Sequence, residues 1–262
     1  MYQKTIQSFD KAEIYYVINK INNDPFLVFI HGAGSNHTIY TPFFQAFEDR
    51  NFIALDIRNH GKSGKANLKT VTIKNIVQDI AIILKKENIY QIILVGNSLG
   101  ATVALEFYKQ HKKMAKKMIL FTLFSKKYVK CSAILYFFAT CTFIIARPFS
   151  GRRTSHFSDY FKYGKRPIWY YPWFDIRGTP VAAVSKLVRE LFQTPIYLYN
   201  ITIPTQIFIS TADHGTKNGV IVSDAKTNKN IYVEHVDSNH VVLTREYEDV
   251  IKRVKNFLEK EK

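Results

Sequence analysis

Three runs of apolar residues, each as long as a β-strand, most constrain what this 262-residue chain can fold into. They occupy residues 26–30, 52–56 and 91–95, and each is followed by a loop rich in glycine or polar residues. Continuous apolar runs of this length are typical of strands buried on both faces, as in parallel sheets. Apolar residues of 72–87 recur at helical spacing. The order strand, helix, strand predicts a mostly parallel central sheet flanked by helices, an α/β fold.

The remainder of the chain extends this sheet and interrupts it once. Short strands are predicted at 2–9 and 13–19, a helix at 101–111 and a further buried strand at 118–123. Strand character returns at 206–210 and 231–236, and an amphipathic helix is predicted at 246–259. Between the strands predicted at 118–123 and 206–210, residues 125–199 show helical segments, aromatic clusters and many basic residues. We therefore predict a core formed by 1–124 and 200–262, with 125–199 as an inserted helical lid.

The positive charge of the chain is concentrated in that insertion. The formal net charge is +16, and residues 109–195 alone carry 17 Lys or Arg against 3 Asp or Glu. Such a field attracts anionic surfaces, acidic substrates or nucleic acid. No nucleic-acid-binding module is recognisable, so we expect no nucleic acid partner. Peripheral contact with an anionic membrane through the basic lid is one interpretation, and a solvated basic outer face of a lid packed on the core is the other.

One stretch, 133–146, resembles a membrane segment in composition. Its fourteen residues fall short of the roughly twenty needed to span a bilayer, which favours a buried or interfacial lid helix. Its surroundings contain the two cysteines, Cys131 and Cys141, which we expect to be buried thiols rather than a disulfide. The opening residues lack the apolar core of a signal peptide, so we expect a cytoplasmic protein, in one interpretation peripheral at membranes.

The sequence Gly96-Asn97-Ser98-Leu99-Gly100 lies between the strand predicted at 91–95 and the next helix. This is the context of a Gly-x-Ser-x-Gly nucleophile elbow, a turn so tight that the serine backbone is strained and its neighbours must be small. We identify Ser98 as the candidate nucleophile.

A second glycine turn, His31-Gly32-Ala33-Gly34, follows the strand predicted at 26–30. Backbone amides of such a turn, with the amide after the nucleophile, can hold a developing oxyanion. The predicted donors are Ala33 and Leu99.

A serine hydroxyl needs a base, and the expected order in this architecture is serine, acid, histidine. His240 follows the strand at 231–236 and Asp213 follows the strand at 206–210, so both lie at carboxyl ends of strands, as Ser98 does. We predict His240 as the base and Asp213 as its orienting acid. The rivals are His214 and His235 for the base and Asp237 for the acid. His31 and His60 are expected to hold loops in place.

Together these motifs resemble the α/β-hydrolase superfamily along most of the chain, on His31 to Gly34, residues 56–63, Gly96 to Gly100, Asp213 and His240. Their order is similar to that of the capped serine esterase, lipase and peptidase branch, which includes monoacylglycerol lipases. Epoxide hydrolases and haloalkane dehalogenases of this superfamily carry aspartate at the elbow, and Ser98 argues against both. Lipases often carry a second glycine after the elbow, where this chain has Ala101. The predicted lid, 125–199, shows no recognisable lid sequence, so the substrate specificity of other lids does not transfer to it.

The resemblance implies a serine hydrolase that cleaves a carboxylic ester, of a small molecule or of a lipid or monoacylglycerol type, through an acyl-enzyme. The aromatic and basic composition of 125–199 favours the lipid. A peptidase or thioesterase with the same triad, or a catalytically silent binding protein of the same fold, is the alternative. We expect no cofactor and no metal, because no set of side chains has metal-ligand spacing.

Overall fold

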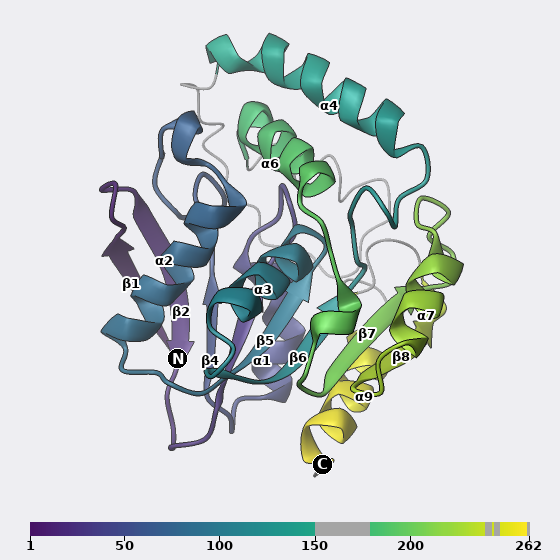
Figure 1. Cartoon of the computed structure of the whole chain (residues 1–262). Coiled ribbons are helices and arrows are strands. Elements are labelled where there is room, and N and C mark those ends of the chain that lie inside the picture. Colours follow the sequence, from purple (N-terminus) through teal and green to yellow (C-terminus); the bar gives the residue numbers. More distant parts are fainter. Residues whose placement is uncertain (150–178, 239–242, 244–246, 261–262) are drawn as a thin grey trace.

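The computed structural model describes residues 1–149, 179–238, 243 and 247–260. Its centre is an eight-stranded sheet in the order β1-β2-β4-β3-β5-β6-β7-β8 (Figure 1). The strands are β1 (Tyr2–Gln7), β2 (Glu13–Asn19), β3 (Phe26–Ile30), β4 (Phe52–Leu55), β5 (Ile92–Asn97), β6 (Ala115–Phe121), β7 (Thr205–Ser210) and β8 (Ile231–Val236). The pairs from β4 to β8 are parallel, whereas β1 with β2 and β2 with β4 are antiparallel. The predicted mostly parallel sheet is confirmed.

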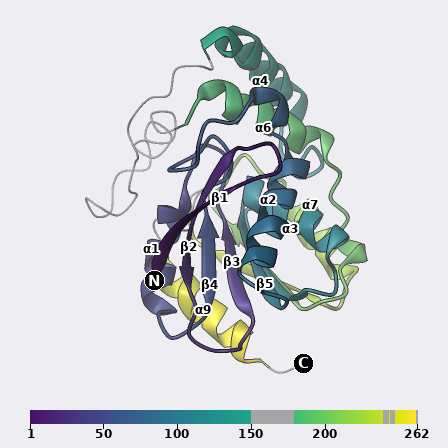
Figure 2. The same cartoon turned by 90° about the vertical axis from the view of Figure 1, so that its left-hand side faces the viewer.

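Helices cover both faces of this sheet (Figure 2). On one face α2 (Ile73–Lys86), α3 (Leu99–Gln110) and α7 (Asn218–Lys226) pack over the larger core cluster. On the other face α1 (Thr41–Ala46) and α9 (Tyr247–Glu259) enclose a second cluster rich in phenylalanine. Both faces of the central strands are buried by this arrangement, and every residue of β3, β4 and β5 is buried.

The helix α2 illustrates how local sequence produces these elements. Thr72 has extended backbone, and its hydroxyl accepts a hydrogen bond from the Asn75 N–H, which caps the first turn. Ile76, Ile80 and Ile83 then recur at helical spacing and are buried against the sheet.

Among the described residues, the α-helices α4 (Ser132–Ala146) and α6 (Val181–Gln193) come between β6 and β7 in the chain. In Figure 1 α4 lies outermost and α6 lies between it and the sheet. The Ile73 N–H donates to Glu190 Oε2 at 2.7 Å, so α6 supplies an acceptor for the first turn of α2. Helices were predicted here and are found. That 125–199 forms a separate lid stays a prediction, and residues 150–178 of it lie outside the described residues.

The cysteines differ from the prediction of buried thiols. Both are free, but Cys131 is exposed and Cys141 is half-buried. The reason is that α4 buries none of its residues, so an apolar sequence around a cysteine does not place it in a core here. Within the described part of the chain, no helix is both long enough and apolar enough to cross a membrane.

Candidate active site at the end of β5

Ser98 stands in the sharp turn between β5 and α3. Its backbone has φ 52° and ψ −111°, a strained conformation for a residue with a side chain. The Ser98 N–H donates to the Phe121 carbonyl at 2.9 Å, which fixes the turn to the end of β6. The residue is partly exposed while both of its neighbours are buried. The turn therefore presents the Ser98 side chain while holding its backbone rigidly.

The two glycines of the elbow are required by close packing. A Cβ on Gly96 would lie 2.3 Å from the Gly100 carbonyl oxygen, and one on Gly100 would lie 1.9 Å from the Ile30 carbonyl oxygen. Both distances are far below van der Waals contact, so only glycine fits either position. Close approach of α3 to β3 thus explains the Gly-x-Ser-x-Gly spacing. Ala101, directly after the elbow, is accommodated as a fully buried residue.

The turn at residues 31–34 lies directly against the elbow, although 66 residues separate Gly32 from Ser98. A Cβ on Gly32 would sit 3.5 Å from Ser98 Cβ and 3.3 Å from Asn97 Nδ2. The Leu99 amide belongs to the first turn of α3, where amides have no acceptor within the helix. The predicted oxyanion donors thus lie in segments next to Ser98: Ala33 in the 31–34 turn and Leu99 at the start of α3.

Two buried histidines hold the 31–34 turn in shape. The Ile57 N–H donates to His31 Nε2 at 3.0 Å, and His31 Nδ1 lies 2.7 Å from the Gly32 carbonyl oxygen, to which it donates in the neutral tautomer. His60 repeats the pattern, because its Nε2 accepts from the Gly34 N–H at 3.0 Å. Complete burial lowers the pKa of His31 to about 4, so its imidazole is neutral at pH 7. These contacts agree with the loop-holding role predicted for both residues.

A buried carboxylate organises the loop after β4. Asp56 accepts hydrogen bonds from the backbone N–H and the Nδ1 of His37, at 2.7 and 2.9 Å, and from the Lys62 N–H at 2.7 Å. Burial alone would raise the pKa of Asp56, but these hydrogen bonds and the neighbouring histidines outweigh it, so its pKa lies below the ordinary value. Gly61, at φ 50°, leaves no room for a Cβ beside this carboxylate. Asp56 is thus a structural anion rather than a candidate acid of the site.

Asp213 lies in the loop that follows β7, at the same edge of the sheet as Ser98. It is buried, and its Oδ1 accepts from the Gly215 N–H at 2.9 Å. β6 separates β5 from β7, so the two loops begin two strand spacings, about 10 Å, apart. The Ala212 N–H donates to the Ser238 carbonyl at 2.9 Å, which joins this loop to the end of β8. His240 itself lies outside the described residues, so its place beside Asp213 stays a prediction.

The rival residues have other surroundings. His214 and Asp237 are exposed, and the Asp237 carboxylate accepts a hydrogen bond from the Thr211 hydroxyl. His235 is an exposed residue within β8. Within the described ranges, no group of three or more His, Cys, Asp or Glu side chains could hold a metal ion.

Sequence reasoning missed Thr179. Its hydroxyl donates to the Gly34 carbonyl at 3.0 Å, and the residue is buried although it lies 145 positions away in the chain. It is followed by Pro180, which precedes α6. A Thr-Pro pair before a helix is a common helix start, so local sequence gave no sign of a contact with the 31–34 turn.

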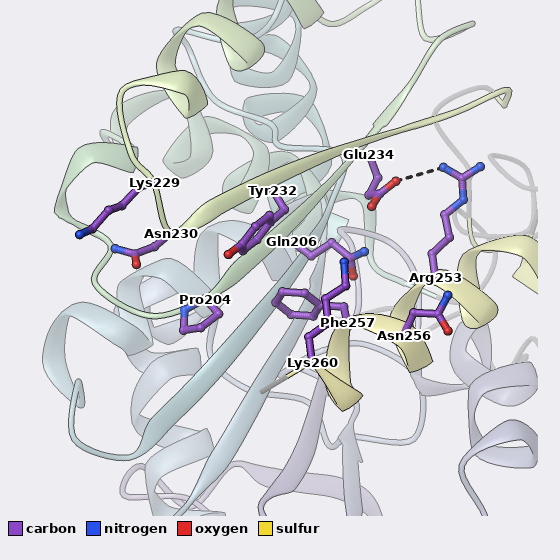
Figure 3. Close-up of a pocket in the computed structure, with 10 residues that line it drawn as sticks. All are labelled: Pro204, Gln206, Lys229, Asn230, Tyr232, Glu234, Arg253, Asn256, Phe257 and Lys260. Carbon is purple, nitrogen blue, oxygen red and sulfur yellow. Dashed lines mark hydrogen bonds and ion pairs between the residues drawn. The ribbon is translucent and has the colours of Figure 1, made fainter. Parts of the chain in front are cut away.

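A cavity of about 520 Å³ opens at the opposite edge of the sheet (Figure 3). It lies at the amino ends of β7 and β8, beside α9, and is lined by the side chains of Gln206, Tyr232 and Phe257, among others. Ligands of parallel α/β sheets bind at carboxyl ends of strands, where Ser98 lies. The cavity is therefore not part of the Ser98 site.

Comparison with known proteins identifies the family. Residues 25–128 match the model of the alpha/beta hydrolase fold family. A probable alcohol acetyltransferase of Cyberlindnera fabianii is 28% identical over 97 residues, which are 36% of this chain and 26% of that protein. The uncharacterized hydrolase YugF of Bacillus subtilis is 28% identical over 132 residues, 50% of this chain and 48% of that one. The matches thus span from about a quarter to about half of the length of these relatives.

Solved structures match over nearly the whole chain. An esterase from Exiguobacterium antarcticum has a TM-score of 0.79 at 18% identity and covers 99% of this chain and 100% of its own. An epoxide hydrolase from Bacillus megaterium has a TM-score of 0.77 at 18% identity, with 98% and 100% covered. These similarities show the fold, and the family match over 25–128 adds the sequence pattern that contains the elbow. Residues 25–128 thus match the alpha/beta hydrolase family in sequence, and the chain as a whole has the α/β-hydrolase fold.

Proposed function

We propose that this hydrolase cleaves carboxylic esters through Ser98, by way of an acyl-enzyme, and prefers acyl groups of lipid type. The observation that carries the proposal is the elbow: Ser98 at φ 52° between two glycines that tolerate no Cβ, with the 31–34 turn packed against it. This conformation is costly, and proteins retain such strain at sites of function. Ser98 also argues against an epoxide hydrolase, a class that in this superfamily carries aspartate at the elbow.

In the proposed reaction, Ser98 Oγ attacks the ester carbonyl carbon while His240 accepts the hydroxyl proton. The negative charge moves to the carbonyl oxygen, which the Ala33 and Leu99 amides hold. The amino end of α3 adds the favourable field of its helix dipole at the same point. The tetrahedral intermediate collapses, the bond to the alkoxy oxygen breaks, and His240 returns the proton to the leaving alcohol.

Water completes the cycle. It attacks the acyl carbon of the acyl-enzyme and loses a proton to His240, and the second intermediate releases the carboxylic acid and restores Ser98. Asp213 holds the imidazole in the required tautomer and stabilises its charged form. The Asp213 loop is well suited to this role, because backbone hydrogen bonds attach it to Val236 and Ser238, and His240 follows Ser238 by two positions in the sequence.

The test is a chain-length series of p-nitrophenyl esters, from acetate to laurate. We expect turnover that rises with acyl length, and loss of at least about a thousandfold in Ser98→Ala. A fluorophosphonate probe should label the wild type and neither Ser98→Ala nor His240→Ala. His235→Ala is the matched control, because it removes an exposed histidine five residues away and should leave both signals unchanged.

Equal product release by the wild type and Ser98→Ala would refute the hydrolase proposal and favour a silent binding protein. Full labelling of His240→Ala, with loss of labelling in His235→Ala, would assign the base to His235. Thioester or peptide substrates cleaved faster than every ester would leave the nucleophile in place and change the substrate class, which is the remaining alternative.

A further inference from the structure

The helix α4 carries its large apolar side chains on the side that faces solvent. It has no charged residue from Ser132 to Ala146 and buries none of its side chains. Six large apolar residues are exposed, with Phe138 at 61% and Ile145 at 70%. We name them the outer face of α4: Ile134, Leu135, Phe137, Phe138, Ile144 and Ile145. Isolated exposed apolar residues are ordinary, but a contiguous row of this size marks an interaction surface.

Contacts with α6 fix which side of α4 points outward. The Gln193 amide donates to the Tyr136 hydroxyl at 3.0 Å, and the Arg189 guanidinium lies over the rings of Tyr136 and Phe143. The Tyr136 ring also packs against Phe192. These partners lie on the inward side, so the outer face cannot turn toward the protein without breaking them. α4 thus differs from an ordinary surface helix, whose solvent side is polar.

Charge indicates what covers this face. Residues 107–158 contain eleven Lys or Arg and no Asp or Glu. Lys126 and Lys130 precede α4, Arg147 follows it directly, and all three are exposed. Cations at both ends of an uncharged apolar helix complement an anionic surface. A second copy of this chain would bring the same cations together and is disfavoured.

We propose that the outer face of α4 docks on an anionic lipid bilayer, with α4 lying flat in the interface. Fifteen residues give a helix of about 22 Å, shorter than the roughly 30 Å hydrocarbon core, so α4 fits the interface and not a span. Apolar side chains enter the boundary between headgroups and acyl chains, and lysine and arginine contact the phosphates. The docking is compatible with the proposed function but does not depend on it.

Vesicle sedimentation tests the docking. At about 0.1 M NaCl, wild-type protein should bind phosphatidylcholine vesicles that contain 30% phosphatidylglycerol. It should bind far less to vesicles of pure phosphatidylcholine. Raising the salt to about 0.5 M shortens the screening length from about 10 Å to about 4 Å and should weaken binding. The variant Phe138→Glu with Ile145→Glu should bind at least about tenfold less tightly. Both side chains are exposed, so circular dichroism should show an unchanged fold.

The matched control replaces two equally exposed residues elsewhere, Tyr90→Glu with Tyr199→Glu, and makes the same change in net charge. It should bind as the wild type does. The proposal is overturned if the wild type does not bind anionic vesicles at low salt, or if the control loses binding as much as the α4 variant. It is also overturned if the wild type is a dimer in solution that the α4 variant converts to monomer, because the occupant would then be a second copy.

Two further measurements separate this proposal from the catalytic one. The α4 variant should still hydrolyse p-nitrophenyl acetate in solution, because its substitutions lie away from Ser98. Ser98→Ala should still bind vesicles. Binding without hydrolysis would refute only the proposed function, and hydrolysis without binding would refute only the docking.

Discussion

The elbow makes a sharp prediction about one methyl group. In Gly100→Ala the new Cβ would lie 1.9 Å from the Ile30 carbonyl oxygen and 2.8 Å from the His31 carbonyl oxygen. The first distance is about 1.5 Å short of the 3.4 Å at which ordinary contact begins. Both neighbours are backbone atoms, so no side-chain rotation relieves the overlap. The Ile30 oxygen is also held in place, because it accepts the Tyr40 hydroxyl at 2.9 Å.

Either α3 or the end of β3 must therefore move. Overpacked cores lose about 1 to 3 kcal/mol, and a clash between backbones belongs at the upper end, so we expect a loss of about 3 kcal/mol or more. For a chain of this size, that corresponds to a fall in Tm of about 6 to 12 °C. The displacement moves Ser98 relative to the 31–34 turn, and a shift of about 1 Å can cost a hundredfold in rate.

The assay is urea unfolding followed by circular dichroism, together with hydrolysis of p-nitrophenyl butyrate. Gly219→Ala provides the control, because a Cβ there meets nothing within 4 Å and the residue lies in the first turn of α7. The same substitution should there leave activity unchanged and stabilise the protein by up to about 1 kcal/mol. A Gly100→Ala protein as stable and as active as the wild type would refute the reasoning.

Three further predictions concern the shell around the site. The pKa of His31 is about 4 in the folded protein and about 6.5 in the unfolded chain, so the unfolded chain binds more protons between these pH values. The free energy of unfolding should therefore be highest above pH 6.5 and fall by about 3 kcal/mol on acidification to pH 4, as measured by urea unfolding. Asp79→Asn should cost about 3 to 5 kcal/mol in the same assay, because the buried Arg58 guanidinium loses the carboxylate that it contacts at 2.6 and 2.8 Å. Thr179→Val should cost about 1 to 2 kcal/mol and lower kcat several-fold, because it removes the hydrogen bond to the Gly34 carbonyl.

Each of these has its own control. His31→Asn should remove the fall in stability between pH 6.5 and 4, whereas His235→Ala should keep it; an unchanged profile in His31→Asn would assign the effect to another group. An Asp79→Asn protein within about 1 kcal/mol of wild type would show that Asp10, at 2.9 Å from Arg58, compensates alone. Thr179→Ser keeps the hydroxyl and should keep kcat, and a Thr179→Val protein with unchanged kcat would show that the hydroxyl has no role in positioning the turn.

The sequence predicts the sheet well because each central strand is a short, continuous apolar run that is recognisable without knowledge of the rest of the chain. Every residue of β3 and β5 is buried, and all but Asn97 are apolar or glycine. The elbow can form only where such a strand meets a helix. The helix α7 was not predicted, because Asn218–Lys226 is short and lacks an apolar stripe. The contacts of Arg58 with Asp10 and Asp79 were also beyond reach, since they join residues 48 and 21 positions apart by geometry alone.

The stretch at 133–146 shows most clearly what sequence leaves open. A helix of fifteen residues without charge fits a protein core and a membrane interface equally well, because both accept apolar side chains. The structure excludes a core position for the outer face, because Tyr136 and Phe143 contact α6 from the other side of α4 and the residues of the outer face are exposed. The prediction of buried cysteines was wrong for the same reason, because α4 buries none of its residues. The Ser98 turn was within reach of sequence because backbone sterics, rather than burial, determine it.

The position of α6 connects the proposed membrane docking with the proposed ester hydrolysis. On one side α6 supports α4, and on the other it contacts the first turn of α2 through Glu190 and the 68–69 carbonyls through Lys186. The first turn of α2 lies at the carboxyl edge of the sheet, as Ser98 does, because α2 begins after β4 ends. A bilayer bound to the outer face of α4 would therefore lie on the Ser98 side of the sheet, not on the side of the cavity beside α9. An ester drawn from that bilayer would reach Ser98 past α6, so substitutions in α6 that face neither α4 nor the sheet should change the chain-length profile while leaving vesicle binding intact.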